Sequence, residues 1–437
     1  MGRSKVKKAT STFRKCGLHF QAEITAVNRS RANRAKRKLK LPKKLKLSKK
    51  LKLPKLQPRE LPPRGGLRRT PGGGFRIRRK MKLYTAYHGL REVNVVDIGG
   101  GRVELEAEHS GLNGDKITLK CIDAQVNGLK WDQHYTARQL AGCAVTVVDI
   151  KKNAEYGKQL EQYRRKARLT VDDKKRRNVL RRLVNGVDIH FFTWHLLDFL
   201  HGVLKFENVI KSNVLFSVHH VANLTNAFFD RVKMLYGDGG QRGDDAGPLG
   251  TADIGGHELG HGWVAMLADL VYEGHAGALN EHFADVLGLC LEWYLDQVFN
   301  QDSDKTNDLP NPAEWLVGED AVGPNGLRNF KNPEANRQPS KYRGKNWVNP
   351  RGKYDYGGVH FNSGVANKCF YELCQRIGML EALLLSFRVL RDKLNRRSTY
   401  MDYRDGMLAY AHKRHFTAVK QCLDLVGLTS SAVSDWY

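Results

Sequence analysis

Two histidines and two glutamates near the middle of the chain have the types and spacing of a metal site that activates water. His257 and His261 are four residues apart, so on a helix they share one face and both imidazoles can reach one metal ion. Glu281 lies twenty residues further on and supplies a third ligand, which leaves a fourth tetrahedral position open for water. Glu258, beside the first ligand, can accept a proton from that water as it attacks a carbonyl group. The spacing therefore predicts a catalytic zinc site.

The charge of the chain is concentrated at its N-terminal end. Residues 1–80 hold 28 of the 73 lysines and arginines and only two acidic residues, so they carry +26 of the net charge of +28. A Leu-Lys-Leu repeat over residues 39–55 contains Pro42 and Pro54, which oppose a continuous helix. We expect residues 1–80 to be a disordered, low-complexity tail. The alternative is a segment that binds nucleic acid, another anionic polymer or a membrane surface.

Cysteines and apolar stretches bear on cofactors and on membrane insertion. The seven cysteines include no Cys-x-x-Cys pair, which argues against a cysteine-bound structural zinc, and their odd number indicates no disulfide framework. No basic stub followed by an apolar core is visible at the N-terminus, so no ordinary signal peptide is expected. The most apolar stretch, residues 191–204, contains His195, Asp198 and His201, and we expect it to be a buried helix and not a membrane span.

Hydrophobic periodicity predicts strands first and helices later, which is an α+β fold class. Alternation predicts strands at residues 102–107 and 116–122, and two further strands near the metal site are expected at 214–218 and 233–236. Residues 152–182 are charged and predicted to be helical, and residues 188–204 form the first strongly apolar helix. The last helices are expected at residues 364–376, 380–394, 403–413 and 418–426.

Beyond the metal motif, residues 187–437 resemble the thermolysin family of neutral zinc metalloendopeptidases. Residues 187–192 resemble the start of that family's first long helix, and residues 226–229 with 234–239 resemble its substrate-pairing edge strand and the following turn. Residues 357–364 resemble the segment that carries its second catalytic histidine. The resemblance implies a two-lobed α+β protein in which the zinc helix lies between a β-rich N-terminal lobe and a helical C-terminal lobe.

The resemblance also implies a role for each matching residue. Zinc is bound by His257, His261 and Glu281, while Glu258 acts on the water. The supporting positions are Asp285 and Asn280, which orient the ligand histidines; His360 held by Asp355, and Tyr272, which stabilise the oxyanion; Arg328, which binds a substrate carbonyl; and Asn226 and Ala227, which hold the peptide as an added strand. Ile254, Val317 and Leu327 match the pocket after the scissile bond, and their apolar character implies cleavage before Leu, Phe or Ile.

A calcium site is implied with less support from the residues themselves. Asp253, Glu292, Glu314 and Glu319 fall where the family gathers carboxylates around calcium, a hard ion that prefers oxygen ligands. Leu316 stands where the family usually has another acid, which opposes a double site. We expect one calcium ion or none, and the alternative is a salt-bridged acidic surface.

These expectations divide the chain into four segments: a basic tail at 1–80, a β-rich region with a charged helical linker at 81–186, a zinc-binding catalytic region at 187–295, and a helical lobe at 296–437. The family implies peptide or protein substrates, a monomer and secretion. Two alternatives stay open. One is a catalytically inactive peptide-binding protein of the same fold, although no ligand or base is missing. The other is an anionic-polymer-binding protein that acts through its basic tail.

Overall fold

The structure is a computed structural model, and all of its described residues belong to one unit, Leu67–Tyr437. The described residues are 68–69, 75–111, 114–130, 133–166, 168–205, 213–222, 224–230, 232–239, 246–299 and 315–429. Most of the predicted tail and Glu314 of the predicted calcium site therefore lie outside the described residues.

The first sheet is formed almost entirely by the segment before residue 105. Its order is β1-β2-β3-β4-β7 and its pairs are antiparallel. The strands are β1 (Arg68–Arg69), β2 (Phe75–Tyr84), β3 (Leu90–Gly99), β4 (Arg102–Glu104) and β7 (Val147–Asp149). Strand β2 crosses the predicted boundary at residue 81. Its arginines belong to the sheet because Arg76 pairs with Glu104, and Arg78 lies 2.8 Å from Glu108.

The second sheet brings the chain to the predicted metal site. Its order is β5-β6-β8-β10-β9, with β6, β8 and β10 parallel and β9 antiparallel at the edge. The strands are β5 (Glu106–Ser110), β6 (Lys116–Asp123), β8 (Val214–Val221), β9 (Ala227–Phe229) and β10 (Lys233–Gly237). The prediction of one strand over residues 102–107 was wrong, because the chain passes from one sheet to the other at the fully buried Leu105.

The charged segment after β7 forms two helices where the sequence predicted one. After the short helix α2 (Ala137–Ala141), helix α3 (Ile150–Arg164) ends before Thr170, whose side chain starts helix α4 (Val171–Gly202) in a capping box with Asp173. Helix α4 continues without a break into the apolar segment predicted at residues 188–204. No helix within the described ranges is long and apolar enough to cross a membrane.

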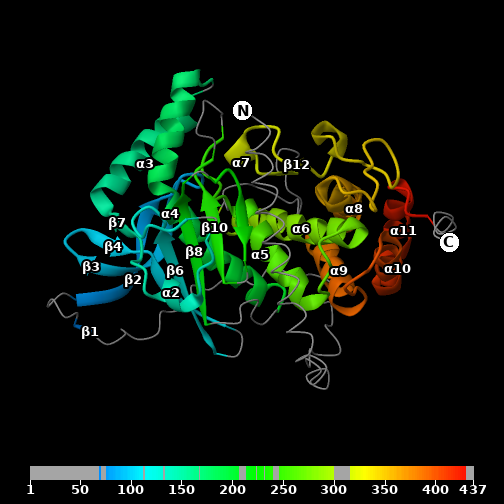
Figure 1. The fold of residues 1–437 in the computed structure, drawn as a ribbon, viewed down its shortest axis with the longest axis horizontal. Helices are drawn as coiled ribbons and strands as arrows, with labels where there is room; N and C mark the ends of the chain where they lie inside the picture. Colours follow the sequence, from blue (N-terminus) through cyan, green and yellow to red (C-terminus); the bar gives the residue numbers. More distant parts are fainter. Residues whose placement is uncertain are drawn as a thin grey trace. The chain divides into compact units, whose positions relative to one another are not determined.

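The remaining chain is mainly helical (Figure 1). Helices α5 (Ala252–Leu267) and α6 (Gly274–Phe299) lie between the strands and the last helices (Figure 1). A two-stranded sheet follows, with β11 (Leu316–Val317), helix α7 (Glu319–Val322) and β12 (Arg328–Asn329). The last helices are α8 (Asp355–Ile377), α9 (Met379–Asp392), α10 (Tyr400–Tyr410) and α11 (Phe416–Leu425). Four helices were expected here, but α8 begins nine residues before the expected start at residue 364.

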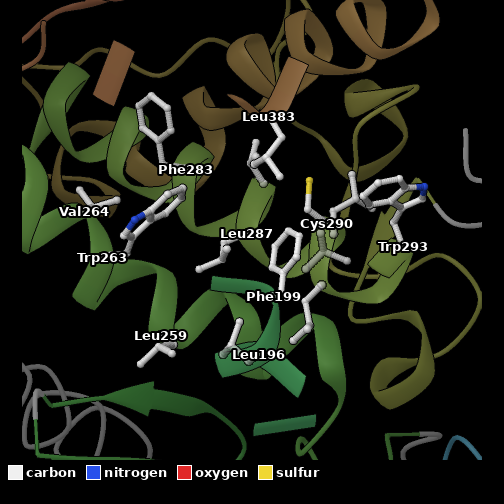
Figure 2. Close-up of a cluster of buried hydrophobic side chains, with 14 of the residues drawn as sticks. Leu196, Phe199, Leu259, Trp263, Val264, Phe283, Leu287, Cys290, Trp293 and Leu383 are labelled. Atoms are coloured by element: carbon white, nitrogen blue, oxygen red, sulfur yellow. The ribbon is translucent and has the colours of Figure 1, made fainter. Parts of the chain in front are cut away.

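A continuous apolar core fixes helices α5 and α6 (Figure 2). Leu259 and Trp263 of α5 pack among Phe283 and Leu287 of α6, and all four side chains are fully buried. Trp263 also stacks on Phe387 of α9, with ring centroids 5.2 Å apart. Because each fully buried aliphatic or aromatic side chain contributes about 1.5–3 kcal/mol, this packing holds both helices firmly in place.

Candidate active site

Helices α5 and α6 approach each other through glycines. A Cβ atom on Gly256 would lie 2.8 Å from the Gly288 Cα atom, and one on Gly260 would lie 2.7 Å from the Ala284 Cα atom. Neither position has room for a side chain unless the helices move apart. These glycines were not predicted to matter, although glycines four residues apart on one helix are a recognisable signal of close helix packing.

The close approach brings the three predicted zinc ligands together. The Nε2 atoms of His257 and His261 lie 3.1 Å apart. Glu281 on α6 places its carboxylate oxygens 3.7 Å from His257 Nε2 and 3.5 Å from His261 Nε2. Two ligand atoms on one tetrahedral zinc ion are about 3.3 Å apart when each bond is about 2.0–2.1 Å. The donor set and its spacing therefore fit zinc.

The other ring nitrogen of each histidine faces an oxygen of α6. His257 Nδ1 lies 2.8 Å from Asp285 Oδ1, and His261 Nδ1 lies 2.9 Å from Asn280 Oδ1. The Asn280 amide is itself oriented, because its nitrogen donates to the Leu270 carbonyl oxygen. Burial lowers the pKa of His261 to about 4, so this ring is neutral at neutral pH, as a metal ligand must be. This arrangement directs both Nε2 lone pairs toward one point.

Glu258 is buried next to the same ligands. The pKa of its carboxyl group is raised to about 7, mainly by burial and also by the negative charge of Glu281, while His257 and Arg328 act to lower it. The backbone of Phe229, on edge strand β9, also lowers it by hydrogen bonding. A carboxyl group whose pKa is near 7 can accept a proton and release it again at neutral pH.

A second group of polar side chains faces Glu281 from helix α8 and from the α5–α6 connection. His360 Nε2 lies 2.9 Å from the Tyr272 hydroxyl and 3.5 Å from Glu281 Oε1. Asp355 Oδ1 lies 2.6 Å from His360 Nδ1, and the backbone N–H of His360 donates to the other oxygen of that carboxylate. The Tyr272 hydroxyl donates to Glu281. The structure thus places His360, Tyr272 and Asp355 together beside the zinc ligands.

Arg328 on β12 contacts two carboxylates of α6. Its guanidinium donates to Glu281 and lies 3.1 Å from Asp285 Oδ2. Burial of Arg328 lowers its pKa, but Asp285 and Glu281 more than compensate, so it stays charged. The sequence analysis expected Arg328 to reach the substrate and did not foresee these two contacts.

The predicted peptide-binding residues lie on two edges near the zinc helix. Ala227 begins strand β9, the edge of the second sheet, directly after the exposed Asn226. On the other side, Leu327 donates its backbone N–H to the Val317 carbonyl oxygen, and Leu327 is 48% exposed while Val317 is buried. Ile254 is buried in the first turn of α5. The exposed Leu327 side chain is available for contact with an apolar substrate side chain.

Carboxylates gather where the first turn of α5 lies near the second half of α6. Asp253 accepts hydrogen bonds from Thr251, from the Ile254 N–H and from the Gly318 N–H. Burial raises the pKa of Glu292 well above its usual value, and Asp253, Glu319 and Asp320 raise it further. One oxygen of Glu292 is buried without a hydrogen-bond partner in the described part of the chain. Asp320, which the sequence analysis did not name, therefore belongs to this cluster.

Comparisons with known proteins identify the family of this chain. Residues 110–265 match the family model of the thermolysin metallopeptidase catalytic domain, and residues 268–428 match that of the thermolysin metallopeptidase alpha-helical domain. The chain is 31% identical over 251 residues to neutral protease NprE from Bacillus pumilus, covering 56% of this chain and 73% of that protein. It is 29% identical over 328 residues to bacillolysin from Bacillus amyloliquefaciens, covering 72% of this chain and 57% of that protein.

A solved structure supports the fold. The precursor of protealysin, a metalloproteinase from Serratia proteamaculans, superposes with a TM-score of 0.52 at 21% identity, covering 72% of this chain and 88% of that chain. The chain spans only 42% of the bacillolysin of Bacillus subtilis strain 168, to which it is 31% identical. The matched regions contain helices α5 and α6, which carry the predicted zinc ligands, and helix α8, which carries His360. The chain belongs to the thermolysin family of zinc metalloendopeptidases.

Proposed function

We propose that the site around His257, His261 and Glu281 hydrolyses peptide bonds within proteins, with Glu258 as the general base. The observation that carries the proposal is the convergence of these three ligands beside a buried glutamate. When bound there, zinc lowers the pKa of a water ligand and polarises the carbonyl group that is attacked. Asp285 and Asn280 hold the ligand histidines in the required orientation.

The residues of the chain then divide the remaining work. Glu258 accepts the proton of the attacking water and passes it to the leaving amine. The imidazole of His360, held by Asp355, lies 2.9 Å from the Tyr272 hydroxyl. In the transition state both groups donate to the oxyanion that develops on the former carbonyl oxygen, and for this the Tyr272 O–H turns from Glu281 to the substrate. Arg328, already bound to Glu281 and Asp285, donates a further N–H to a substrate carbonyl.

The substrate is an extended peptide. Strand β9 is an edge strand, so a peptide can add to it through backbone hydrogen bonds, with Asn226 and Ala227 as partners. Ile254, Val317 and Leu327 form the pocket for the residue after the scissile bond. Because all three are apolar, the preferred residues are Leu, Phe and Ile.

The carboxylate cluster supports a calcium site beside the active site. Glu292 has a buried oxygen without a hydrogen-bond partner in the described part of the chain, and Asp253, Glu319 and Asp320 surround it with negative charge. Oxygen ligands of this kind suit calcium, and a cation there offsets their repulsion. We propose one ion, because Leu316 stands where the family usually has another acid. Asp320 joins the predicted ligands Asp253, Glu292 and Glu319 in this cluster.

The decisive experiment replaces Glu258 by glutamine. This variant should keep one zinc ion and lose nearly all hydrolysis of casein, because only the base is removed. Glu155→Gln on the exposed surface of α3 is the matched control and should keep both properties. Turnover close to wild type in Glu258→Gln contradicts the mechanism, and a wild-type protein that binds zinc but cleaves nothing favours the inactive peptide-binding alternative.

We propose that the basic tail, residues 1–80, serves localisation and not catalysis. It carries nearly all of the net charge and can therefore attract anionic polymers. Since β2 begins at Phe75, a truncated chain should begin at Leu67 and not at Met81. It should cleave peptides at the wild-type rate and lose retention on a polyanionic resin, with retention by the full chain falling steeply with salt. Equal retention of both proteins would contradict this role.

A further inference from the structure

A second group of potential metal ligands lies on the second sheet, outside the active site. Strands β6, β8 and β10 are parallel neighbours, so their carboxyl ends meet at one edge of the sheet. Asp123 ends β6, His219 and His220 lie near the end of β8, and Asp238 follows β10 directly. Imidazole and carboxylate groups therefore gather at this edge, and Asp123, His219 and His220 of β6 and β8 form the cluster of potential ligands.

The local backbone allows adjacent histidines to face the same point. Asp123 is the register partner of His219, so their side chains share one face of the sheet. In a regular strand His220 would point to the opposite face. Instead, His220 has a φ of 55°, and the two imidazole centroids lie 4.4 Å apart. One donor atom each from Asp123, His219 and His220 then lies within 4.8 Å of the others.

Hydrogen bonds orient the imidazole rings of His219 and His220 and leave one ring nitrogen of His219 without a hydrogen-bond partner among the described residues. His220 Nε2 donates to the Arg182 carbonyl oxygen at 2.6 Å, and His219 Nε2 lies 3.0 Å from Thr146 Oγ1. His219 is 3% exposed, yet its Nδ1 has no hydrogen-bond partner among the described residues. Metal-binding histidines characteristically use the second ring nitrogen for such a bond to a carbonyl or other oxygen.

The Asp123 carboxylate and the His219 ring are both held in place. Asp123 Oδ1 accepts the backbone N–H groups of Gln125 and Val126, which holds the carboxylate while Oδ2 lies 2.9 Å from His220 Nδ1. Helix α4 leaves room for the His219 ring because residue 186 is glycine. A Cβ atom added at Gly186 would lie only 2.9 Å from His219 Nε2.

We propose that Asp123, His219 and His220 bind one divalent transition-metal ion of the zinc class, in addition to the catalytic zinc. Imidazole nitrogen combined with carboxylate oxygen is a donor set that zinc accepts readily. The ion joins β6 to β8 at the end of the sheet, and its role is structural. The competing arrangement is a protonated His220 that donates to Asp123 with no metal.

Metal counting on the full-length protein separates the two arrangements. After dialysis against micromolar free Zn²⁺, the wild type should hold two zinc ions per chain. Asp123→Asn and His220→Gln should each hold one and keep peptidase activity. His134→Gln, which removes an exposed histidine outside the cluster, should hold two. A second zinc that survives in both site variants overturns the proposal.

A measurement on the wild type does not depend on the folding of any variant. Titration of the metal-free wild-type protein with Co²⁺ should show two saturable equivalents, each with visible d–d absorption. A single equivalent overturns the proposal and leaves the protonated His220–Asp123 pair as the explanation of the geometry.

Discussion

Replacing Gly288 by alanine should weaken zinc binding, because Gly288 is the point where α6 touches the first turn of the zinc helix. The added Cβ atom would lie 3.1 Å from the Asp253 carbonyl carbon and 3.2 Å from the His257 backbone nitrogen, and closer still to the Asp253 carbonyl oxygen. Favourable contacts between heavy atoms need about 3.5–4.0 Å, so the two helices must separate by roughly 1 Å. Neither neighbour is a flexible side chain that could turn away.

The displacement acts on the ligands directly. Glu281 is seven residues before Gly288, two turns earlier on the same face of α6. Metal sites tolerate errors of only about 0.2 Å in ligand distances, so a shift of this size removes Glu281 from its position relative to His257 and His261. We expect zinc affinity to fall by about 10–100-fold, as when a supporting partner of a ligand is lost. Overpacking should also lower the free energy of unfolding by about 1–3 kcal/mol.

Zinc affinity is measured by competition with a chromogenic chelator, and stability by urea unfolding of the metal-free protein. Gly202→Ala is the matched control, because this glycine ends helix α4 and nothing lies within 4 Å of its added Cβ atom. The control should bind zinc like the wild type and be equally or slightly more stable. If Gly288→Ala also matches the wild type in both measurements, the contact between α5 and α6 does not set the ligand geometry.

Three further outcomes are expected. His360→Ala should lower kcat by about 10²–10³ with little change in KM, since the lost donor acts on the transition state, and a rise in KM alone would assign His360 to substrate binding. Cleavage of a peptide library should show a graded preference for Leu, Phe and Ile after the cut, because one methylene is worth about 1–3 kcal/mol, and dominance of Lys, Arg or Asp would contradict the apolar pocket. Burial alone would raise the pKa of Asp198, but hydrogen bonds from His109 and His195 hold it below its usual value. The ionised carboxylate therefore stabilises the fold above about pH 4, and this stabilisation is lost as the pH falls. In urea unfolding, Asp198→Asn should therefore cost about 1–3 kcal/mol at pH 7 and progressively less below pH 4; a cost independent of pH would refute this.

The convergence of His257, His261 and Glu281 could be predicted from sequence because their geometry is largely local. His257 and His261 are brought together by one turn of helix, and only Glu281 depends on a second helix. The strands β6, β8 and β10 and the last helices were also predictable, since their apolar periodicity is uninterrupted.

Other features depend on contacts that a local pattern does not contain. The alternation over residues 102–107 shows that one face of the segment is apolar and the other polar. It cannot show that the chain passes from one sheet to the other at Leu105. The left-handed backbone of Asp355 and Tyr356, before Gly357 and Gly358, positions His360, yet only the glycines have a sequence signal for it. Asp320 joins the carboxylates around Glu292 only through tertiary packing.

The division of the active site between elements has a consequence for how mutations act. The zinc ligands and their partners Asn280 and Asp285 stand on α5 and α6, which are locked by the core and by the glycine contacts. His360 and Asp355 stand on α8, and Tyr272 on the connection between α5 and α6. Changes at the α5–α6 contact should therefore lower zinc affinity and turnover together. Changes in the first turn of α8 should lower turnover while zinc stays bound, so metal content and kcat measured on the same variants distinguish the two groups.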